Sequence, residues 1–121
     1  MRRVLMVGIV LALVAVLLSS CALSAVRGGP VPTDRLSDGV YRGSARNGPV
    51  SAVVEIVVED QAIREIELVR HRTWWGGAAE EAIPRSIIER QSTSVDAVSG
   101  ATISSTAIMN AVQDAVEKAT N

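Results

Sequence analysis

The sequence changes its hydrophobic pattern near residue 77, and this change constrains the fold more than any other feature. Before it, β-branched residues gather in runs that turn signals separate: 40–46, 50–59 and 63–70. After it, apolar residues recur at helical spacing along 77–91 and beyond 104. Strands followed by helices predict an α+β domain. We expect two C-terminal helices to pack on one face of a small antiparallel sheet of about three strands.

Two of these elements carry more detailed predictions. In the third run, strict alternation would place Ile66 and Leu68 on one face of the sheet and Ile63 on the other. In the first helical segment, Pro84 would cost roughly 3 kcal/mol if it lay in a helix interior. We therefore expect this helix to begin near Ile83, so that Pro84 falls in the first turn, where proline is tolerated.

The first 20 residues are typical of an export signal. Arg2 and Arg3 precede an apolar run, Val4–Leu18, that is short for a membrane-spanning helix and suits a signal peptide. The following Leu18-Ser19-Ser20-Cys21 resembles the lipobox of bacterial lipoproteins, which implies acylation of Cys21 and cleavage before it. The alternatives are an uncleaved N-terminal anchor and an ordinary secretory signal with a chance cysteine.

These features predict three parts: a lipoprotein signal peptide (1–20), a lipidated flexible tether (21–36) and one folded domain (37–121). The tether is rich in glycine and proline over 28–32 and has little hydrophobic periodicity, so we expect it to let the domain stand off the membrane. The expected location is the extracytoplasmic side of the cell membrane or the outer membrane, held by the lipid.

Composition excludes several kinds of site. The chain has one cysteine, Cys21, and one histidine, His71, so an intrachain disulfide, a cysteine zinc site and a metal cluster are not expected. It has 12 basic and 13 acidic residues, and removal of Arg2 and Arg3 with the signal would make it more acidic. A mildly acidic domain has no electrostatic footprint for nucleic acid.

The segment Asp96-Ala97-Val98-Ser99-Gly100-Ala101-Thr102 carries the strongest chemical signal. It places the hydroxyl of Thr102 after a turn of small residues and before the last amphipathic helix. Gly100 permits close approach of the backbone, and Ala101 leaves no bulk beside the hydroxyl. Free N–H groups at the start of the helix, together with its dipole, favour a phosphate there.

Two serines follow this segment, and two interpretations remain open for them. The hydroxyls of Ser104 and Ser105 would add donors to a phosphate site. Alternatively, the segment is a plain helix start, in which Asp96 forms an Asx turn, Ser99 bends the chain and a serine caps the helix. In either case we expect Ser104 or Ser105 to be the N-cap of the final helix.

The same segment resembles the FMN-binding domain family, which includes flavin-carrying subunits of ion-pumping redox complexes and many small exported proteins. Its members carry an Asp, a Ser or Thr, Gly-Ala and then the Thr or Ser that takes FMN. Here these positions fall on Asp96, Ser99, Gly100, Ala101 and Thr102. The resemblance extends to 78–91 and to Asp38-Gly39-Val40-Tyr41, and covers most of the chain after residue 37.

The resemblance implies a flavoprotein in which FMN is joined to Thr102 by a phosphoester. A flavin transferase with bound magnesium would use FAD as the donor, and AMP would leave as the Thr102 hydroxyl attacks the phosphorus next to FMN. Thr102 would then be an acceptor substrate, and no residue of this chain would be catalytic. The other expected partners are the membrane, through the lipid, and membrane or periplasmic redox proteins.

Several residues outside the motif have two interpretations each. Trp74 and Trp75 either stack on the isoalloxazine ring or cover the small core and fill a loop. His71 either hydrogen bonds to the flavin or moves a proton, or it is incidental at a strand end. Four arginines either neutralise the flavin phosphate or form solvated faces: Arg42, Arg46, Arg70 and Arg72.

Three functions are therefore open at this point. The first is an electron carrier with covalent FMN and no substrate pocket of its own. The second is a small flavin-dependent reductase, against which the size of the domain argues, because it leaves little room for a separate substrate site. The third is a flavin-free lipoprotein that binds a partner protein.

Overall fold

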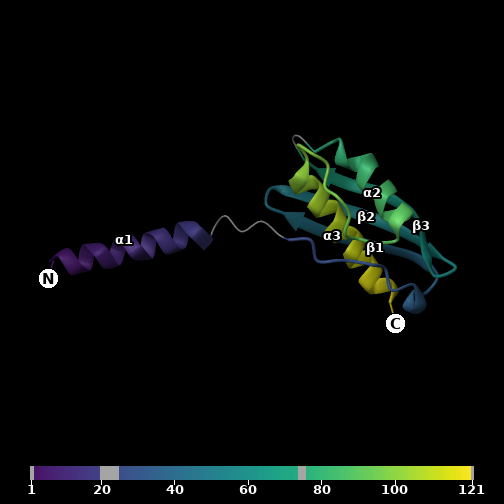
Figure 1. The fold of residues 1–121 in the computed structure, drawn as a ribbon, viewed down its shortest axis with the longest axis horizontal. Helices are drawn as coiled ribbons and strands as arrows, with labels where there is room; N and C mark the ends of the chain where they lie inside the picture. The colour runs from purple at the N-terminus through teal and green to yellow at the C-terminus, as the bar shows by residue number, and fades with distance from the viewer. Residues whose placement is uncertain (1, 20–24, 74–75, 121) are drawn as a thin grey trace.

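A computed structural model describes residues 2–19, 25–73 and 76–120. Its elements follow in the order α1 (Arg2–Ser19), a short 3-10 helix η1 (Thr33–Arg35), β1 (Gly39–Asn47), β2 (Val50–Glu59), β3 (Ala62–Arg72), α2 (Ala79–Arg90) and α3 (Thr102–Ala119). No helix within these residues combines the length and the apolar character needed to cross a bilayer. Figure 1 shows α1 as a helix of its own and the other elements gathered in one domain.

The strands form one three-stranded antiparallel sheet in the order β1-β2-β3. Two-residue loops join them, since Asn47 pairs with Val50 and Glu59 pairs with Ala62. In the second loop both residues have positive φ, 51° and 62°, as a type I′ hairpin turn requires. The helices α2 and α3 cover one face of this sheet (Figure 1). The predicted α+β class is confirmed.

β3 departs from strict alternation at a β-bulge. Val57 pairs with Glu65 whereas Val58 pairs with Ile63, so Arg64 is an extra residue on β3. The extra residue shifts the alternation by one position, and Ile63 therefore shares the core face with Ile66. The prediction that Ile63 would face the opposite side was wrong, because the pairing register of two strands is not encoded in the alternation of one.

α2 begins at Ala79 and not near Ile83, so Pro84 lies inside the helix. Proline has no N–H to donate to the carbonyl one turn earlier, which costs roughly 3 kcal/mol. Ile83 and Ile87 are 1% and 0% exposed. Burying one isoleucine contributes about 1.5–3 kcal/mol, so the apolar face of α2 offsets the cost of the proline. The packed helix therefore tolerates Pro84 in its interior.

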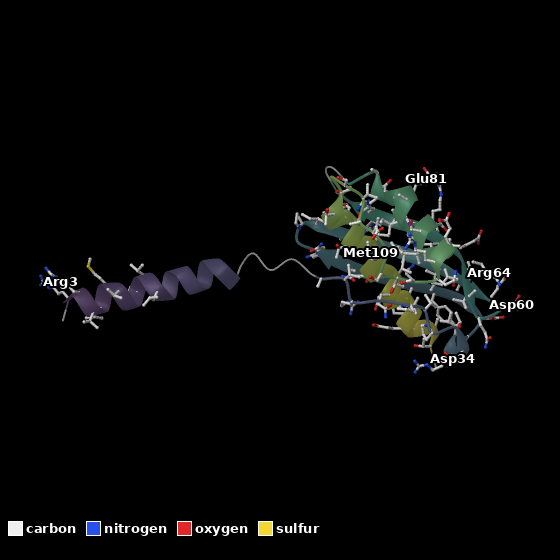
Figure 2. The ribbon with its side chains drawn as sticks, in the orientation of Figure 1. Arg3, Asp34, Asp60, Arg64, Glu81 and Met109 are labelled. Carbon is white, nitrogen blue, oxygen red and sulfur yellow. The ribbon has the colours of Figure 1, made fainter. Side chains whose placement is uncertain are left out.

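α3 lies directly on the sheet, and its contact with β1 depends on Gly43. A Cβ at Gly43 would stand 2.0 Å from the carbonyl oxygen of Ala111 and 2.5 Å from the amide nitrogen of Ala115. The inner face of α3 is fully buried and includes Met109, which Figure 2 labels within the domain. This close approach fixes the axis of α3 and therefore the position of its first residue, Thr102.

Residues 25–36, which we expected to be part of a flexible tether, are bound to the domain. Buried Asn110 on α3 donates to the carbonyl of Ala25 and accepts from the amide of Arg27, both at 2.9 Å. Farther along, Gly29 and Thr93 exchange hydrogen bonds, and Ser37 donates to the carbonyl of Ala119. Glycine and proline composition did not reveal this, because the partners are polar side chains and carbonyls far away in the sequence.

Candidate functional site

A cavity of about 910 Å³ lies at the end of the sheet where the β1–β2 hairpin, the end of β3 and the start of α3 meet. Figure 1 shows that hairpin and the start of α3 at the same end of the domain. Ligand pockets have volumes of roughly 300–1,000 Å³, so the space suits a mononucleotide-sized molecule. Its wall is made of Pro49, Val50, His71, Arg72, Thr73, Gly76, Gly100, Ala101, Thr102, Ile103 and Ser104.

Thr102 stands on the cavity wall as the first residue of α3, and it is exposed. A turn delivers the chain to it: the amide of Ala101 donates to the carbonyl of Val98 at 2.9 Å, and Gly100 has a φ of +81°. A positive φ at the third position is the mark of a type II turn, which glycine adopts without strain. The turn thus places the Thr102 hydroxyl at the N-terminus of α3.

No side chain caps the N-terminus of α3 among the described residues. The N-cap is Ala101, which has no side-chain hydrogen bond to offer. The prediction that Ser104 or Ser105 would cap this helix was wrong, because the helix begins earlier than that, at Thr102. The first-turn N–H groups therefore remain free of a side-chain cap beside the cavity, an arrangement that favours an anion.

Ser104 lines the cavity but is already engaged with the loop after β3. Its Oγ donates to Oγ1 of Thr73 at 2.9 Å, and the same Oγ1 accepts from the amide of Gly76 at 2.9 Å. A Cβ at Gly76 would stand 1.8 Å from the Ser104 Oγ, so only glycine fits there. Ser104 therefore fixes residues 73 and 76 against the start of α3.

Ser105 supports the turn and does not line the cavity. Its buried hydroxyl donates to the carbonyl of Ala101 at 2.7 Å and accepts from the amide of Val98 at 3.0 Å. Because both interactions are internal, Ser105 holds Gly100 and Thr102 in place without offering a donor to a ligand. It therefore stabilises the turn that precedes Thr102.

The structure brings together part of the predicted motif. Gly100, Ala101 and Thr102 line the cavity, whereas Asp96 and Ser99 are exposed and do not. Of the four arginines, Arg72 alone belongs to the cavity wall, and Arg42 pairs with Glu55 at 3.3 Å. Trp74 and Trp75 lie outside the described residues.

Sequence reasoning missed Asn47, the last residue of β1. It is 2% exposed, and its Nδ2 donates to the carbonyl of Ile103 at 3.1 Å. This bond ties the β1–β2 hairpin to the first turn of α3 and so closes one side of the cavity. The Asn-Gly-Pro pattern indicated a turn, but it gave no signal of the contact with α3.

His71 reaches the core face through a second bulge in β3. Val54 pairs with Leu68 whereas Val53 pairs with Arg70, so Val69 is an extra residue. His71 then stands opposite buried Ala52 and lines the cavity. Strict alternation from Leu68 would have turned His71 to the outer face of the sheet.

The imidazole of His71 is buried, and only one of its two ring nitrogens has a hydrogen-bond partner among the described residues. Its side chain is 2% exposed, and its Nδ1 lies 2.9 Å from Oε1 of Glu80 on α2. Its Nε2 is buried and has no hydrogen-bond partner within the described part of the chain. Leaving a buried polar atom without a partner costs about 1–3 kcal/mol, so such an atom beside a cavity marks a place where a ligand group fits.

Two comparisons with known proteins bear on this cavity. The family model described as the FMN-binding domain matches residues 46–117. Urocanate reductase of Eggerthella lenta is 33% identical over 79 residues, which make up 64% of this chain and 13% of the reductase. The chain thus spans a small part of the length of that curated relative. The family match runs from the end of β1 into the last turn of α3 and includes the whole cavity wall.

The residues on the wall fit FMN as the cofactor. The uncapped helix start and Arg72 suit its phosphate, and the apolar surface of Val50 and Ile103 suits its ring. The buried Nε2 of His71 supplies a polar atom that needs a partner. The cofactor is FMN, and the role of the domain is flavin binding for redox chemistry. With its match over more than half its length, the chain belongs to the FMN-binding domain family.

Proposed function

We propose that this chain is a membrane-anchored, extracytoplasmic electron carrier whose FMN is joined to Thr102 by a phosphoester. The observation that supports the linkage most strongly is the position of Thr102. It is exposed, it lies on the wall of the cavity, and it begins a helix that no described side chain caps. A hydroxyl in that position is accessible to a transferase and close to the N–H groups that would hold the product phosphate.

The proposed modification is a phosphoryl transfer. The Thr102 Oγ–P bond forms, the bond to AMP within the pyrophosphate of FAD breaks, and the hydroxyl proton passes to a base of the transferase. The transferase also supplies the magnesium that neutralises the leaving AMP. This chain contributes the acceptor and its presentation, because Gly100 and Ala101 add no side-chain bulk on the approach to Thr102.

Once FMN is attached, it supplies transfer of one or two electrons, and the protein binds, orients and shields it. The uncapped N-terminus of α3 and the Arg72 guanidinium would hold the phosphate. Thr73 and Gly76, which hydrogen bonds link to Ser104, form another part of the wall beside it. A covalent link suits a carrier outside the cytoplasm, where a lost cofactor is hard to replace.

The membrane anchor in this proposal is a lipid on Cys21, which lies outside the described residues. It rests on the basic residues, the apolar run and the lipobox-like Leu18-Ser19-Ser20-Cys21. The anchor would keep the carrier beside membrane or periplasmic redox proteins. Several acyl chains give durable attachment where one chain gives only marginal binding.

A flavin-dependent reductase is the second candidate, because urocanate reductase of Eggerthella lenta shares this segment. The shared part is 13% of that enzyme. We favour the carrier, because a domain of this size leaves little room for a separate substrate site. Reduction of a small substrate by the purified flavinylated chain, with no partner protein added, would favour the reductase instead.

Intact mass spectrometry tests the linkage. The chain is co-expressed with a flavin transferase as wild type, as Thr102→Ala and as Ser44→Ala, which removes an exposed hydroxyl outside both the motif and the cavity wall. We expect a gain of one FMN less one water in the wild type and in Ser44→Ala, and no gain in Thr102→Ala. An unmodified wild type, or a modified Thr102→Ala, would contradict the proposal.

A further inference from the structure

We propose that His71, oriented by Glu80, hydrogen bonds through its Nε2 to a donor group of the bound FMN. The inference rests on the flavin site proposed in the cavity beside Thr102. His71 would be a second point at which this chain holds the cofactor, on the same cavity wall as Thr102.

The placement of His71 is a specific feature of β3. The bulge at Val69 turns its side chain to the core face, opposite Ala52, where strict alternation would have left it in solvent. Its side chain is 2% exposed and it belongs to the wall that also contains Thr102. Two different elements, β3 and α3, thus bring a buried imidazole and the acceptor hydroxyl to one space.

Glu80 fixes which nitrogen of the ring carries the hydrogen. Its Oε1 lies 2.9 Å from Nδ1, and a carboxylate only accepts hydrogen bonds. Nδ1 is therefore the donor of this pair, and in the neutral ring Nε2 is left as an acceptor. The pair resembles the way that a carboxylate orients a histidine toward a ligand held at its other nitrogen.

Nε2 is buried and has no partner among residues 2–19, 25–73 and 76–120. The hydrogen bond to Glu80 uses Nδ1 alone and does not require Nε2 to be buried, and burial of Nε2 without a partner costs free energy. FMN carries donors that a neutral Nε2 accepts, namely the ring N–H and the ribityl hydroxyls. Its phosphate, once esterified to Thr102, has only acceptor oxygens, so the partner is on the ring or the ribityl chain.

Nitrogen NMR of the imidazole tests this directly, because His71 is the only histidine of the chain. Its two ring resonances are therefore assigned without ambiguity in the unmodified and the flavinylated protein. We expect the Nδ1-protonated tautomer in both, and an upfield shift of the unprotonated Nε2 resonance in the flavinylated protein. An Nε2 resonance that is the same in both proteins would overturn the inference.

A matched pair of glutamate variants tests the orienting role. Glu80→Gln removes the carboxylate that faces Nδ1, whereas Glu81→Gln alters the adjacent residue, whose side chain pairs with Arg85. We expect Glu80→Gln to give a mixture of the two imidazole tautomers and Glu81→Gln to keep the single tautomer of the wild type. A single Nδ1-protonated tautomer in Glu80→Gln would contradict the role of Glu80.

Two substitutions of His71 separate its nitrogens in the flavinylated protein. His71→Asn keeps an amide near the position of Nδ1 and loses the polar atom at Nε2, whereas His71→Gln keeps a polar atom near Nε2. Both retain Thr102, so intact mass confirms that FMN is attached before the flavin is studied. We expect the midpoint potential and the visible absorption of the flavin to shift in His71→Asn and to return toward wild type in His71→Gln.

Failure of the linkage and failure of this inference give different results. If intact mass shows no FMN on Thr102, the phosphoester is wrong, and titration of the wild type with free FMN still shows whether the Nε2 resonance moves. If FMN is attached and His71→Asn has the potential and spectrum of the wild type, the linkage stands and the hydrogen bond from FMN to Nε2 of His71 is wrong.

Discussion

At the scale of single residues, the site depends on side chains that hold the backbone rather than on groups with reactive chemistry. Ser105, Ser104 and Asn47 each use a side-chain hydrogen bond to fix a segment next to Thr102. A buried hydrogen bond adds only about 0.5–1.5 kcal/mol, but an orphaned partner costs about 1–3 kcal/mol. The geometry of the acceptor is therefore sensitive to changes that never touch the cofactor.

Asn47→Ala tests this at the hairpin. The substitution leaves the carbonyl of Ile103 without its donor and removes a side chain that is 2% exposed. We expect a loss of about 1–3 kcal/mol in the free energy of unfolding, measured by urea denaturation, and slower flavinylation of Thr102 by the transferase. Ser44→Ala, an exposed side chain on the same strand, serves as the comparison for a surface change. An Asn47→Ala protein as stable as Ser44→Ala would contradict this view of Asn47.

Gly43→Ala tests the close approach of α3 to β1. The new methyl group would meet the Ala111 carbonyl at 2.0 Å, so α3 has to move away from the sheet. Overpacking of this kind costs about 1–3 kcal/mol, and we expect a corresponding fall in the urea midpoint. Gly77→Ala is the matched control, since a Cβ there has nothing within 4 Å. Equal midpoints for the two variants would show that α3 does not pack closely against Gly43.

At the scale of elements, the sequence was sufficient to predict the strands and helices but not how the strands pair with one another. The runs at 40–46, 50–59 and 63–70 each became a strand, because β-branched patterning and turn residues act locally. The bulges at Arg64 and Val69 were not predictable, since they reflect how β3 pairs with β2. The second bulge is what brings His71 to the cavity.

The contrast between local patterns and long-range packing also explains the other differences between the prediction and the structure. The cost of Pro84 in a helix interior predicted that α2 begins near Ile83, but the helix begins one turn earlier, at Ala79, which is fully buried. Within the candidate site, the motif that resembles the FMN-binding domain family pointed to Gly100, Ala101 and Thr102, and these residues line the cavity. The docking of 25–36 depends on side chains that only the folded chain brings near.

The docked segment leads to a prediction about its own dynamics. Asn110 holds the backbone at Ala25 and Arg27, so Asn110→Ala removes both bonds at once. We expect amide hydrogen exchange at residue 27 to rise by about 5- to 150-fold, since two bonds of about 0.5–1.5 kcal/mol each are lost. Glu117→Gln, an exposed change on the same helix, is the control. Unchanged exchange at residue 27 in Asn110→Ala would show that other contacts hold this segment.

At the scale of the whole molecule, the docked segment determines how far the domain stands from its proposed anchor. With a lipid on Cys21 and the chain bound to α3 from Ala25 onward, the residues between these two positions can span at most roughly 14 Å at 3.3–3.6 Å per residue. The proposed carrier would therefore work close to the bilayer surface. Its redox partners would be proteins whose electron-accepting groups lie near the membrane.

Cys21→Ser tests the anchor independently of the flavin. We expect the wild type in the membrane fraction after cell lysis, because several acyl chains bind a bilayer durably, and Cys21→Ser in the soluble fraction. Flavin content per chain, measured by absorbance, should be equal in the two proteins if both are exported. A Cys21→Ser protein that stays in the membrane fraction would show that the N-terminal segment, and not a lipid, holds the chain.

The central claim is the bond between FMN and the hydroxyl of Thr102, and peptide-level mass mapping of the flavinylated chain tests it most directly. Thr102→Ser keeps a hydroxyl, whereas Thr102→Val keeps the shape of threonine and removes the acceptor. The proposal predicts FMN less water on the peptide that contains residue 102 in the wild type and in Thr102→Ser, and no such mass in Thr102→Val. FMN on any other peptide, or on the peptide of Thr102→Val, would contradict it.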